Sequence, residues 1–373
     1  MVAGGGTGGH VYPALAVVEG LRKRDPRALF LWIGSPNKLE SQVVPLANID
    51  FRAIKLRGLS RRFNIAGIFG NIAALFEASR ALKESKRIIS EFKPQVVIGT
   101  GGYVSGPPVA QAVKMGVPSV LIEPNSYPGL TVRWLAKRVD RIFLGYEEAV
   151  QYLPGANYMV TGTPVREEFL NAKRDDGIHA MGLLVGKPCL LVVGGSQGAE
   201  NINRAVLEFV EIAANEEPGL LHDIQILHQT GGKGPSQLEE IRSKYPQADY
   251  MKTSYIDRMP LALAAADFIV SRAGAATLSE IKARGMASVL IPYPYAAEDH
   301  QYKNAKAMSD AGAAVLIEDK ELNGRTLFNV VTPLLKDPVR RNDMAAKAKG
   351  MFRPDCLDVI CSEIFRLAGD TPA

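Results

Sequence analysis

A repeated pattern of an apolar run, a glycine-rich loop and a helix most constrains the fold of this chain. The pattern occurs three times, with its loops at 4–9, 99–108 and 192–203. Short runs rich in aliphatic and β-branched residues alternate with helical patterns along the chain: ALFLWIGS, QVVIGTGG, PSVLIEP, DRIFLGY, PCLLVVGGS, DIQILHQT, DFIVSRAG and ASVLIPYP. Strands that alternate with helices form parallel sheets that are buried on both faces. The sequence therefore predicts an α/β chain with doubly wound parallel sheets.

The third glycine loop falls about half way along the 373 residues, which predicts two domains. The second domain restarts near Pro188, and TGTPVREEF at 161–169 suits a hinge because its proline and glycine disfavour an element interior. Only three residues precede the first loop. We therefore expect the first strand to have about half the usual strand length.

Charge is unevenly distributed between the two halves. The formal net charge is +5, but residues 1–160 carry +9 and the remainder carries −4. The first half therefore favours an anionic partner.

Cysteine usage and hydropathy exclude several protein classes. Cys189, Cys356 and Cys361 form no CxxC pair, so we expect no disulfide framework and no zinc site, as in a reducing cytoplasm. The longest apolar stretch, at 63–76, is too short to cross a bilayer. We expect neither a signal peptide nor a membrane-spanning segment.

The first loop, GGGTGG, matches the GxGxxG pattern through Gly4, Gly6 and Gly9. Such loops hold the pyrophosphate of a dinucleotide at a helix N-terminus. A nicotinamide site also needs an acidic residue at the end of the second strand, where this chain has GSP. Without that acidic residue, the loop still presents backbone amides beside a helix start. Because glycines have no side chains, a ligand can approach these amides closely.

His10 follows this loop and falls in the first turn of the predicted helix. The positive end of the helix dipole disfavours the imidazolium form, which keeps the ring available as a base near pH 7. From spacing alone, the alternative that His10 merely caps or packs at the helix start stays open.

The segment SRAGAATLSEIKARG places a turn of small residues before a helix in the second half. Backbone amides over 274–277 would face a diphosphate there. Glu280 would accept hydrogen bonds from a ribose diol, or it would form a capping box with Thr277, since the spacing fits S/T-x-x-E. Downstream, Asp299, His300, Gln301 and Asn304 form either a reader of sugar hydroxyls or a solvated loop.

Basic residues surround an apolar segment at 55–87, where Arg61 and Arg62 precede Phe63, Ile65 and Phe69. A basic rim around an apolar face suits anionic headgroups and shallow burial in a membrane. The alternative is a helix whose apolar stripe packs on its own sheet. We expect Phe63, Ile65 and Phe69 to contact lipid.

Eight segments that nearly span the chain carry a family resemblance: GGGTGGHVYPALAV, GTGGYVSGPPVAQA, EPNSYPGLTVRWLAK, TGTPVREEF, GGSQGAENIN, YIDRM, RAGAATLSEI and HQYKNA. In this order they resemble the MurG family, UDP-N-acetylglucosamine transferases that convert lipid I to lipid II in bacterial peptidoglycan synthesis. The resemblance implies a GT-B fold, with two Rossmann-like doubly wound parallel-sheet domains facing across a cleft. It also implies inverting transfer without a cofactor or an obligatory metal.

The resemblance implies a division of labour along the chain. Residues 1–163 would bind the acceptor and the membrane, residues 164–342 would bind the donor, and residues 343–373 would be a helix crossing back to the first domain. The donor would be UDP-N-acetylglucosamine and the acceptor the C4 hydroxyl of MurNAc in lipid I. Further expected partners are an anionic cytoplasmic membrane surface and cell-wall synthesis and division proteins, but not nucleic acid. The implied location is peripheral, on the cytoplasmic face of the inner membrane.

Site residues follow from the resemblance position by position. His10 would be the general base. Asn125 would contact the sugar, Arg166 and Ser196 the diphosphate, and the backbone of Ile256 the uracil. Glu280 would bind the ribose. The full set of implied donor contacts is Thr7, Gly8, Gly9, Asn125, Arg166, Ser196, Ile256, Ala275, Ala276, Thr277, Leu278, Ser279, Glu280, Gln301 and Asn304, and the implied acceptor contacts are Gly102, Tyr103 and Ser105.

Three other functions compete with the transferase. An NAD-dependent oxidoreductase would use the GxGxxG match, but the second strand lacks the ribose-binding acid. A UDP-N-acetylglucosamine 2-epimerase would share the fold and the donor pocket without needing a lipid-facing surface. A non-catalytic membrane scaffold would keep the basic apolar segment and tolerate loss of Glu280 and Gln301.

Overall fold

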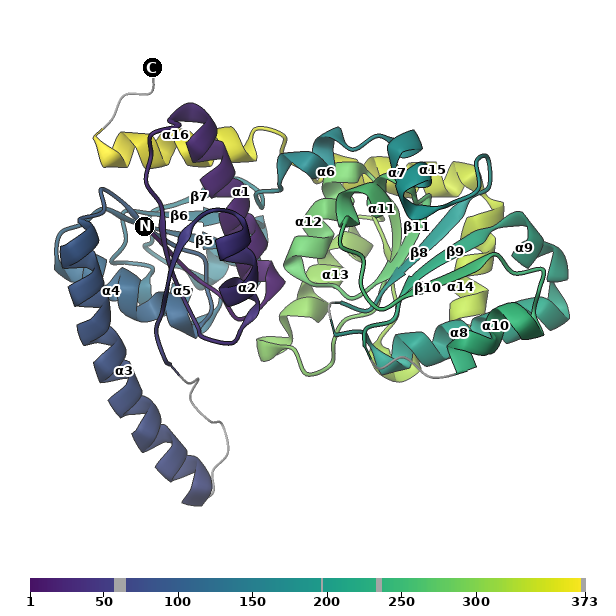
Figure 1. Cartoon of the computed structure of the whole chain (residues 1–373), viewed down its shortest axis with the longest axis horizontal. Helices are drawn as coiled ribbons and strands as arrows, with labels where there is room; N and C mark the ends of the chain where they lie inside the picture. The colour runs from purple at the N-terminus through teal and green to yellow at the C-terminus, as the bar shows by residue number, and fades with distance from the viewer. Residues whose placement is uncertain (57–64, 196, 233–236, 370–373) are drawn as a thin grey trace. The chain divides into compact units, whose positions relative to one another are not determined.

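The computed structural model describes residues 1–56, 65–195, 197–232 and 237–369, with the backbone course alone over 65–75. The chain divides into two compact units, and each contains one parallel sheet (Figure 1). Unit 1 consists of Met1–Arg166 and Arg353–Ala373, and unit 2 consists of Glu167–Phe352. The predicted fold class, two Rossmann-like parallel-sheet α/β domains, is confirmed.

The sheet of unit 1 has seven strands within the described residues, in the order β3-β2-β1-β4-β5-β6-β7. All neighbouring pairs are parallel. The order reverses between β1 and β4, so the loops after these strands meet at the switch point where ligands bind in such sheets. The strands are β1 Val2–Ala3, β2 Leu31–Gly34, β3 Asp50–Ala53, β4 Val97–Gly99, β5 Ser119–Glu123, β6 Arg141–Leu144 and β7 Tyr158–Val160.

Helices cover both faces of this sheet. One face packs against α1, α2 and α16, and the other against α3, α4 and α5. Gly20 on α1 lets α16 approach, because a Cβ there would lie 2.9 Å from Sγ of Cys361. The helices of unit 1 are α1 Gly8–Arg24, α2 Leu39–Leu46, α3 Ile65–Phe92, η1 Tyr103–Ser105, α4 Gly106–Lys114, α5 Leu130–Leu135, η2 Glu147–Tyr152 and α16 Cys356–Ala368.

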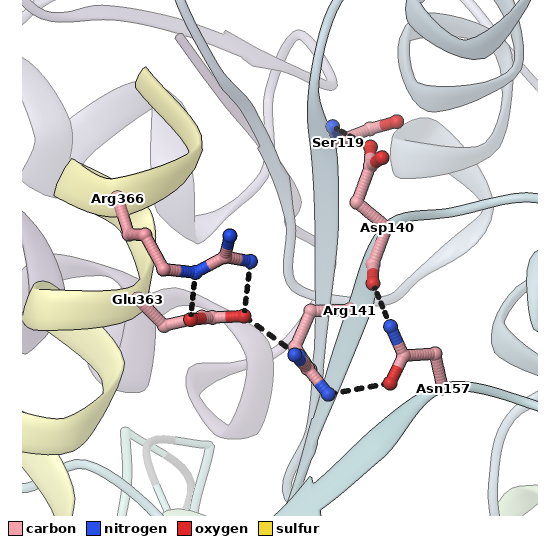
Figure 2. A network of polar contacts seen from close by, with 6 residues as sticks. All are labelled: Ser119, Asp140, Arg141, Asn157, Glu363 and Arg366. Carbon is pink, nitrogen blue, oxygen red and sulfur yellow. Dashed lines mark hydrogen bonds and ion pairs between the residues drawn. The ribbon is translucent and has the colours of Figure 1, made fainter. Parts of the chain in front are cut away.

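A polar network also holds α16 to the sheet of unit 1 (Figure 2). Arg141 Nε donates to Glu363 Oε1 at 2.8 Å, and Arg366 donates to both oxygens of the same carboxylate at 2.7 and 3.0 Å. The hydrogen bonds from Arg366 hold the pKa of Glu363 below its usual range, with Arg141 adding to the effect and burial opposing it. The network extends to the starts of β5, β6 and β7 through Asn157, Asp140 and Ser119.

The sheet of unit 2 has six strands among the described residues, in the order β10-β9-β8-β11-β12-β13. Its switch point lies between β8 and β11. The strands are β8 Cys189–Val193, β9 Gln225–Gln229, β10 Tyr250–Thr253, β11 Phe268–Ser271, β12 Ala287–Leu290 and β13 Val315–Leu316. The helices are α6 Glu167–Asn171, α7 Arg174–Met181, α8 Glu200–Glu216, α9 Pro218–Asp223, α10 Gln237–Lys244, α11 Met259–Ala265, α12 Ala275–Arg284, η3 Ala297–Asp299, α13 His300–Asp310, η4 Asp319–Glu321, α14 Gly324–Lys336 and α15 Pro338–Gly350.

The unit boundaries differ from the expected domain limits of 163 and 342, since the units meet at residues 166/167 and 352/353. Instead of one helix over 343–373, the structure forms α15 in unit 2 and α16 in unit 1. Helix α15 begins earlier than expected because Asp337 caps it, accepting from the amide of Arg340 at 2.9 Å. Pro354 lies in the break between the two helices, where it cannot continue a helix.

Candidate functional site

The first two glycine loops meet at the switch point of unit 1. They follow β1 and β4, which are hydrogen-bonded neighbours. Their backbones touch, because a Cβ on Gly102 would lie 2.4 Å from the carbonyl oxygen of Gly5. The structure therefore brings the predicted residues Thr7, Gly8 and Gly9 close to the predicted acceptor loop at 102–105.

His10 is the third residue of α1, directly after the N-cap Thr7 and two glycines. The prediction that it lies in the first turn of a helix is confirmed. Its ring packs on the second loop, since a Cβ on Gly101 would lie 2.6 Å from His10 Nδ1. Gly101 also has a φ of +93°, a backbone conformation that favours glycine. The role of His10 as a base stays a prediction.

The predicted acceptor loop at 102–105 is held in part by the side chain of Ser105. Ser105 is buried, and its hydroxyl donates to the carbonyl of Gly102 at 2.9 Å, so it shapes the loop. Tyr103 in the same turn is 52% exposed and is open to a ligand.

Two further predicted donor contacts lie in unit 1. The side-chain amide of Asn125 donates to Glu123 Oε1 at 2.9 Å, and Glu123 also accepts from the amide of Gly129 at 2.7 Å. This buried carboxylate fixes the loop that follows β5. The guanidinium of Arg166 stacks over the ring of Tyr12, 4.8 Å from its centroid.

Two buried side chains that the sequence analysis did not single out hold the first glycine loop. Trp32 Nε1 donates to the carbonyl of Gly4 at 2.9 Å, and Glu40 Oε2 accepts from the amide of Gly6 at 2.9 Å. The Gly6 amide therefore already has an anionic partner within the protein. An amide bonded in this way is not available to donate to a pyrophosphate. A search for an acid at the end of β2 misses Glu40, because it lies six residues later in α2.

The loops after β8, β9 and β10 lie side by side, and the first of them borders the switch point of unit 2. Gly198 has a φ of +76°, and a Cβ there would lie 2.0 Å from the carbonyl oxygen of Thr230. Gln229 is the buried last residue of β9, and the sequence analysis did not predict a role for it. Its side chain connects the loops after β8 and β10 by hydrogen bonds. Its Nε2 donates to the carbonyl of Gly195 at 3.0 Å, and its Oε1 accepts from the amide of Ile256 at 2.9 Å. The amide of Ile256, whose backbone is predicted to contact uracil, is therefore bonded within the protein. Ser196 lies outside the described residues.

Helix α12 begins at this switch point with its N-cap at Gly274. The amides of Ala275, Ala276 and Thr277 are the first of the helix and have no intrahelical acceptor, which makes this end suitable for a phosphate. Thr277 and Glu280 are the third and sixth residues of α12.

The capping-box interpretation of Thr277 and Glu280 is therefore wrong, because Gly274 caps the helix three residues earlier. Leu278 and Ser279 are buried, and the Ser279 hydroxyl donates to the carbonyl of Ala275 at 2.7 Å. These two side chains stabilise the helix. Glu280 is half-buried on the same helix.

The segment before α13 has an unusual backbone. Glu298 and Asp299 have φ values of 56° and 58°, in the left-handed region that non-glycine residues rarely adopt. Gln301 Oε1 accepts from the amide of Tyr293 at 3.0 Å, so its Nε2 is the group that would donate to a sugar hydroxyl. Asn304 is buried in α13.

A chain of buried hydrogen bonds links α8, β9 and β10 and holds the loop that follows β9. Asn203 Nδ2 donates to the carbonyl of Thr230 at 2.9 Å, so Asn203 Oδ1 accepts from His228 Nε2 at 3.0 Å. With its proton on Nε2, His228 accepts at Nδ1 from the hydroxyl of Tyr250 at 2.8 Å. Burial lowers the pKa of His228 to about 3, with the charge of Lys252 adding to the effect.

This low pKa predicts that acid destabilises unit 2. His228 takes up a proton near pH 6.5 in the unfolded chain but only near pH 3 in the folded one. The contribution of His228 to the free energy of unfolding is therefore fully present above pH 6.5 and is lost progressively as the pH falls toward 3. Between pH 7 and pH 5 we expect His228 to cost about 2 kcal/mol in the free energy of unfolding. Urea unfolding at both pH values would show this loss in the wild type and a smaller one in His228→Gln. The control His222→Gln removes an exposed histidine and should keep the pH dependence of the wild type. The prediction would be contradicted if the free energy of unfolding had the same pH dependence in all three proteins.

The predicted membrane segment is described only in part. Arg61, Arg62 and Phe63 lie outside the described residues. Ile65 and Phe69 fall in the first two turns of α3, where only the backbone is described. Within the described ranges, we find no helix with the length and apolar character needed to cross a membrane.

Two doubly wound parallel sheets, each with glycine loops at its switch point, are the architecture of the GT-B class of proteins. A putative UDP-N-acetylglucosamine 2-epimerase from Listeria monocytogenes shares this fold with a TM-score of 0.69 over 100% of this chain and 97% of its own, at 13% identity. The crystal structure of Acinetobacter baumannii MurG matches with a TM-score of 0.75 at 28% identity, covering 98% of this chain and 99% of that chain.

Sequence comparison identifies the family. The glycosyltransferase family 28 N-terminal domain matches residues 1–144, and the C-terminal domain of the same family matches residues 189–360. A protein of Desulforamulus reducens is 40% identical over 366 residues, which is 96% of each chain, and one of Bacillus subtilis is 37% identical over 355 residues, which is 95% of each chain. Both are named UDP-N-acetylglucosamine--N-acetylmuramyl-(pentapeptide) pyrophosphoryl-undecaprenol N-acetylglucosamine transferase. The chain belongs to glycosyltransferase family 28, and the resemblance to the MurG family is confirmed.

Proposed function

We propose that this chain transfers N-acetylglucosamine from UDP-N-acetylglucosamine to the C4 hydroxyl of MurNAc in lipid I, giving lipid II and UDP in peptidoglycan synthesis. The observation that carries this proposal is the identity of about 40% over nearly the whole chain with transferases of that name. The two switch points support it, because each presents bare backbone and a helix N-terminus to a ligand.

The proposed mechanism is a direct displacement with inversion at the anomeric carbon. The acceptor C4 oxygen forms the new bond to that carbon as the bond to the UDP oxygen breaks. His10 takes the proton of the C4 hydroxyl, and its position in the first turn of α1 supports a neutral ring that is ready to accept one. The step needs no metal, because the charge that develops on UDP is stabilised by the protein.

The donor-binding roles rest mainly on unit 2. The first amides of α12 bind the leaving diphosphate, assisted by Arg166 and Ser196. Glu280 accepts hydrogen bonds from the ribose diol, and the carbonyl of Ile256 accepts from uracil. Asn125, Gln301 and Asn304 bind the transferred sugar, while Gly102 and Tyr103 face the acceptor.

Membrane association is the second part of the proposal. A membrane surface on the cytoplasmic side would hold both the enzyme and its lipid-linked acceptor. The excess of positive charge in residues 1–160 supports attraction to anionic lipids, and the segment from Arg61 to Phe69 supplies basic and apolar side chains. The protein would then act peripherally at the inner membrane, beside cell-wall synthesis and division proteins.

UDP release from UDP-N-acetylglucosamine tests the function directly. We expect release that requires a lipid I analogue and continues in EDTA, with N-acetylglucosamine appearing in the acceptor. Isomerisation of the nucleotide sugar without acceptor would instead identify an epimerase. Loss of turnover in EDTA that added Mg²⁺ restores would overturn the metal-independent mechanism.

Gly101→Ala tests the contact between the second loop and His10. The added Cβ falls 2.6 Å from the ring, at a φ of +93° that alanine rarely adopts. Displacement of a catalytic group by about 1 Å lowers rates roughly 100-fold, so we expect kcat to fall 10- to 100-fold. The control Gly116→Ala has a similar φ of +70° but open space for the Cβ, and should keep its turnover. Equal kcat values for the two variants would show that the contact does not matter.

A further inference from the structure

Glu40 is a fully buried carboxylate at the second residue of α2, beside the first glycine loop. Its Oε2 accepts from the amide of Gly6 and its Oε1 from the amide of Ser35, each at 2.9 Å. Each of the two oxygens accepts from a backbone amide of a different loop. Glu40 therefore links the loops that follow β1 and β2.

The contact is close because the facing residues are glycines. A Cβ on Gly5 would lie 2.0 Å from Glu40 Oε1, and a Cβ on Gly34 would lie 2.6 Å from Glu40 Cγ. On its other side, Gly5 meets the loop after β4, where its carbonyl oxygen faces Gly102. The first glycine loop is thus held between the Glu40 carboxylate and the second glycine loop.

This arrangement determines where α1 begins. Gly6 has a φ of +94° and directly precedes Thr7, the extended N-cap of the helix. His10 follows three residues later and packs on Gly101. A displacement of Gly6 would therefore move the helix start and the imidazole together.

We propose that Glu40 is a positioning residue that fixes the place of His10 through the amide of Gly6. Glu40 is fully buried, so its proposed action is through the loop and not through a contact with substrate. The proposal rests on the proposed function, in which His10 removes the proton of the acceptor hydroxyl. A carboxylate suits this role because it presents acceptors to two loops at once. A glutamine of the same shape would turn an NH₂ group toward one of the two amides, so a donor would face a donor.

The variant Glu40→Gln tests the proposal in the full-length protein. We expect kcat to fall roughly 10- to 100-fold, since small misplacements of a catalytic group have effects of this size. The Kd for UDP should change less than about twofold, because the proposed contacts to uracil, ribose and diphosphate lie outside the first glycine loop. The matched control is Val44→Ala, which removes a fully buried side chain from the same helix without touching the loop. Folded fractions measured by circular dichroism correct each kcat for stability.

A double-mutant cycle and an NMR measurement separate positioning from a general loss of stability. In a His10→Ala background, Glu40→Gln should lower kcat no further. The chain has five histidines, so in protein labelled with isotopes at histidine the ring signals of His10 can be assigned. The chemical shifts of the His10 ring should change in Glu40→Gln but not in Val44→Ala. An additive loss in the cycle, or an unmoved His10 signal, would overturn the proposal. A wild-type protein without transfer activity would refute the proposed function instead, and the NMR result would still test the position of His10.

Discussion

Replacement of His10 by alanine is expected to lower kcat by about 10²- to 10⁴-fold, the usual contribution of a general base. UDP binding should stay within about twofold of wild type, because the diphosphate and uracil contacts lie in other elements. The helix start should form normally, since alanine is a good helix former. Steady-state kinetics with a lipid I analogue and calorimetry with UDP would measure both effects.

The control His179→Ala removes an exposed histidine from α7 and should leave kcat unchanged. A kcat for His10→Ala within threefold of wild type would mean that another group takes the proton. In that case the acidic limb of the pH–rate profile should persist in the variant, and it should vanish if His10 is the base.

Glu280→Ala has the second-largest expected effect, a rise of roughly 100-fold in KM for UDP-N-acetylglucosamine. Hydrogen bonds from two ribose hydroxyls to a carboxylate would contribute about 3 kcal/mol in all, which corresponds to that factor. The structure supports this role because Glu280 is not a cap of α12 and is half-buried, at the sixth residue of the helix. Initial rates at varied donor concentration provide the measurement.

A donor analogue sharpens this test. A 2′-deoxyribose donor should bind the wild type less tightly but should bind Glu280→Ala as the normal donor does, because the lost partner is the same. Glu240→Ala, an exposed position on α10, serves as the control and should keep the wild-type KM. If the losses of affinity caused by Glu280→Ala and by the 2′-deoxy analogue were additive, the ribose hydroxyl would not be bound by Glu280.

The central strands of both sheets could be predicted from the sequence, and the edge strands could not. The quoted apolar runs cover β2, β4, β5, β6, β8, β9, β11 and β12, which are buried on both faces. The strands without such runs include β3, β7, β10 and β13, and these are the edges of the two sheets. An edge strand is partly exposed, as DFRA in β3 shows, so it lacks a continuous apolar signal.

The site was predictable where the backbone itself carries the signal. The glycine loops and the small-residue turn that the sequence shows follow central strands of the two sheets, and such residues permit a close approach of backbone. Glu40, Trp32 and Gln229 could not be found this way. Each acts by a hydrogen bond to a loop distant in sequence, and nothing in its own neighbourhood marks that partner.

Unit 1 is built from both ends of the chain, because α16 packs on α1 beside Gly20 and Glu363 bonds Arg141 (Figure 2). Unit 2 is continuous over Glu167–Phe352. During synthesis on the ribosome, every residue of unit 2 therefore emerges before the last helix of unit 1. Until then the apolar surface of α1 stays uncovered and needs protection from aggregation. The unit that begins first is thus completed last, and translation must reach α16 before the unit that carries His10 is whole.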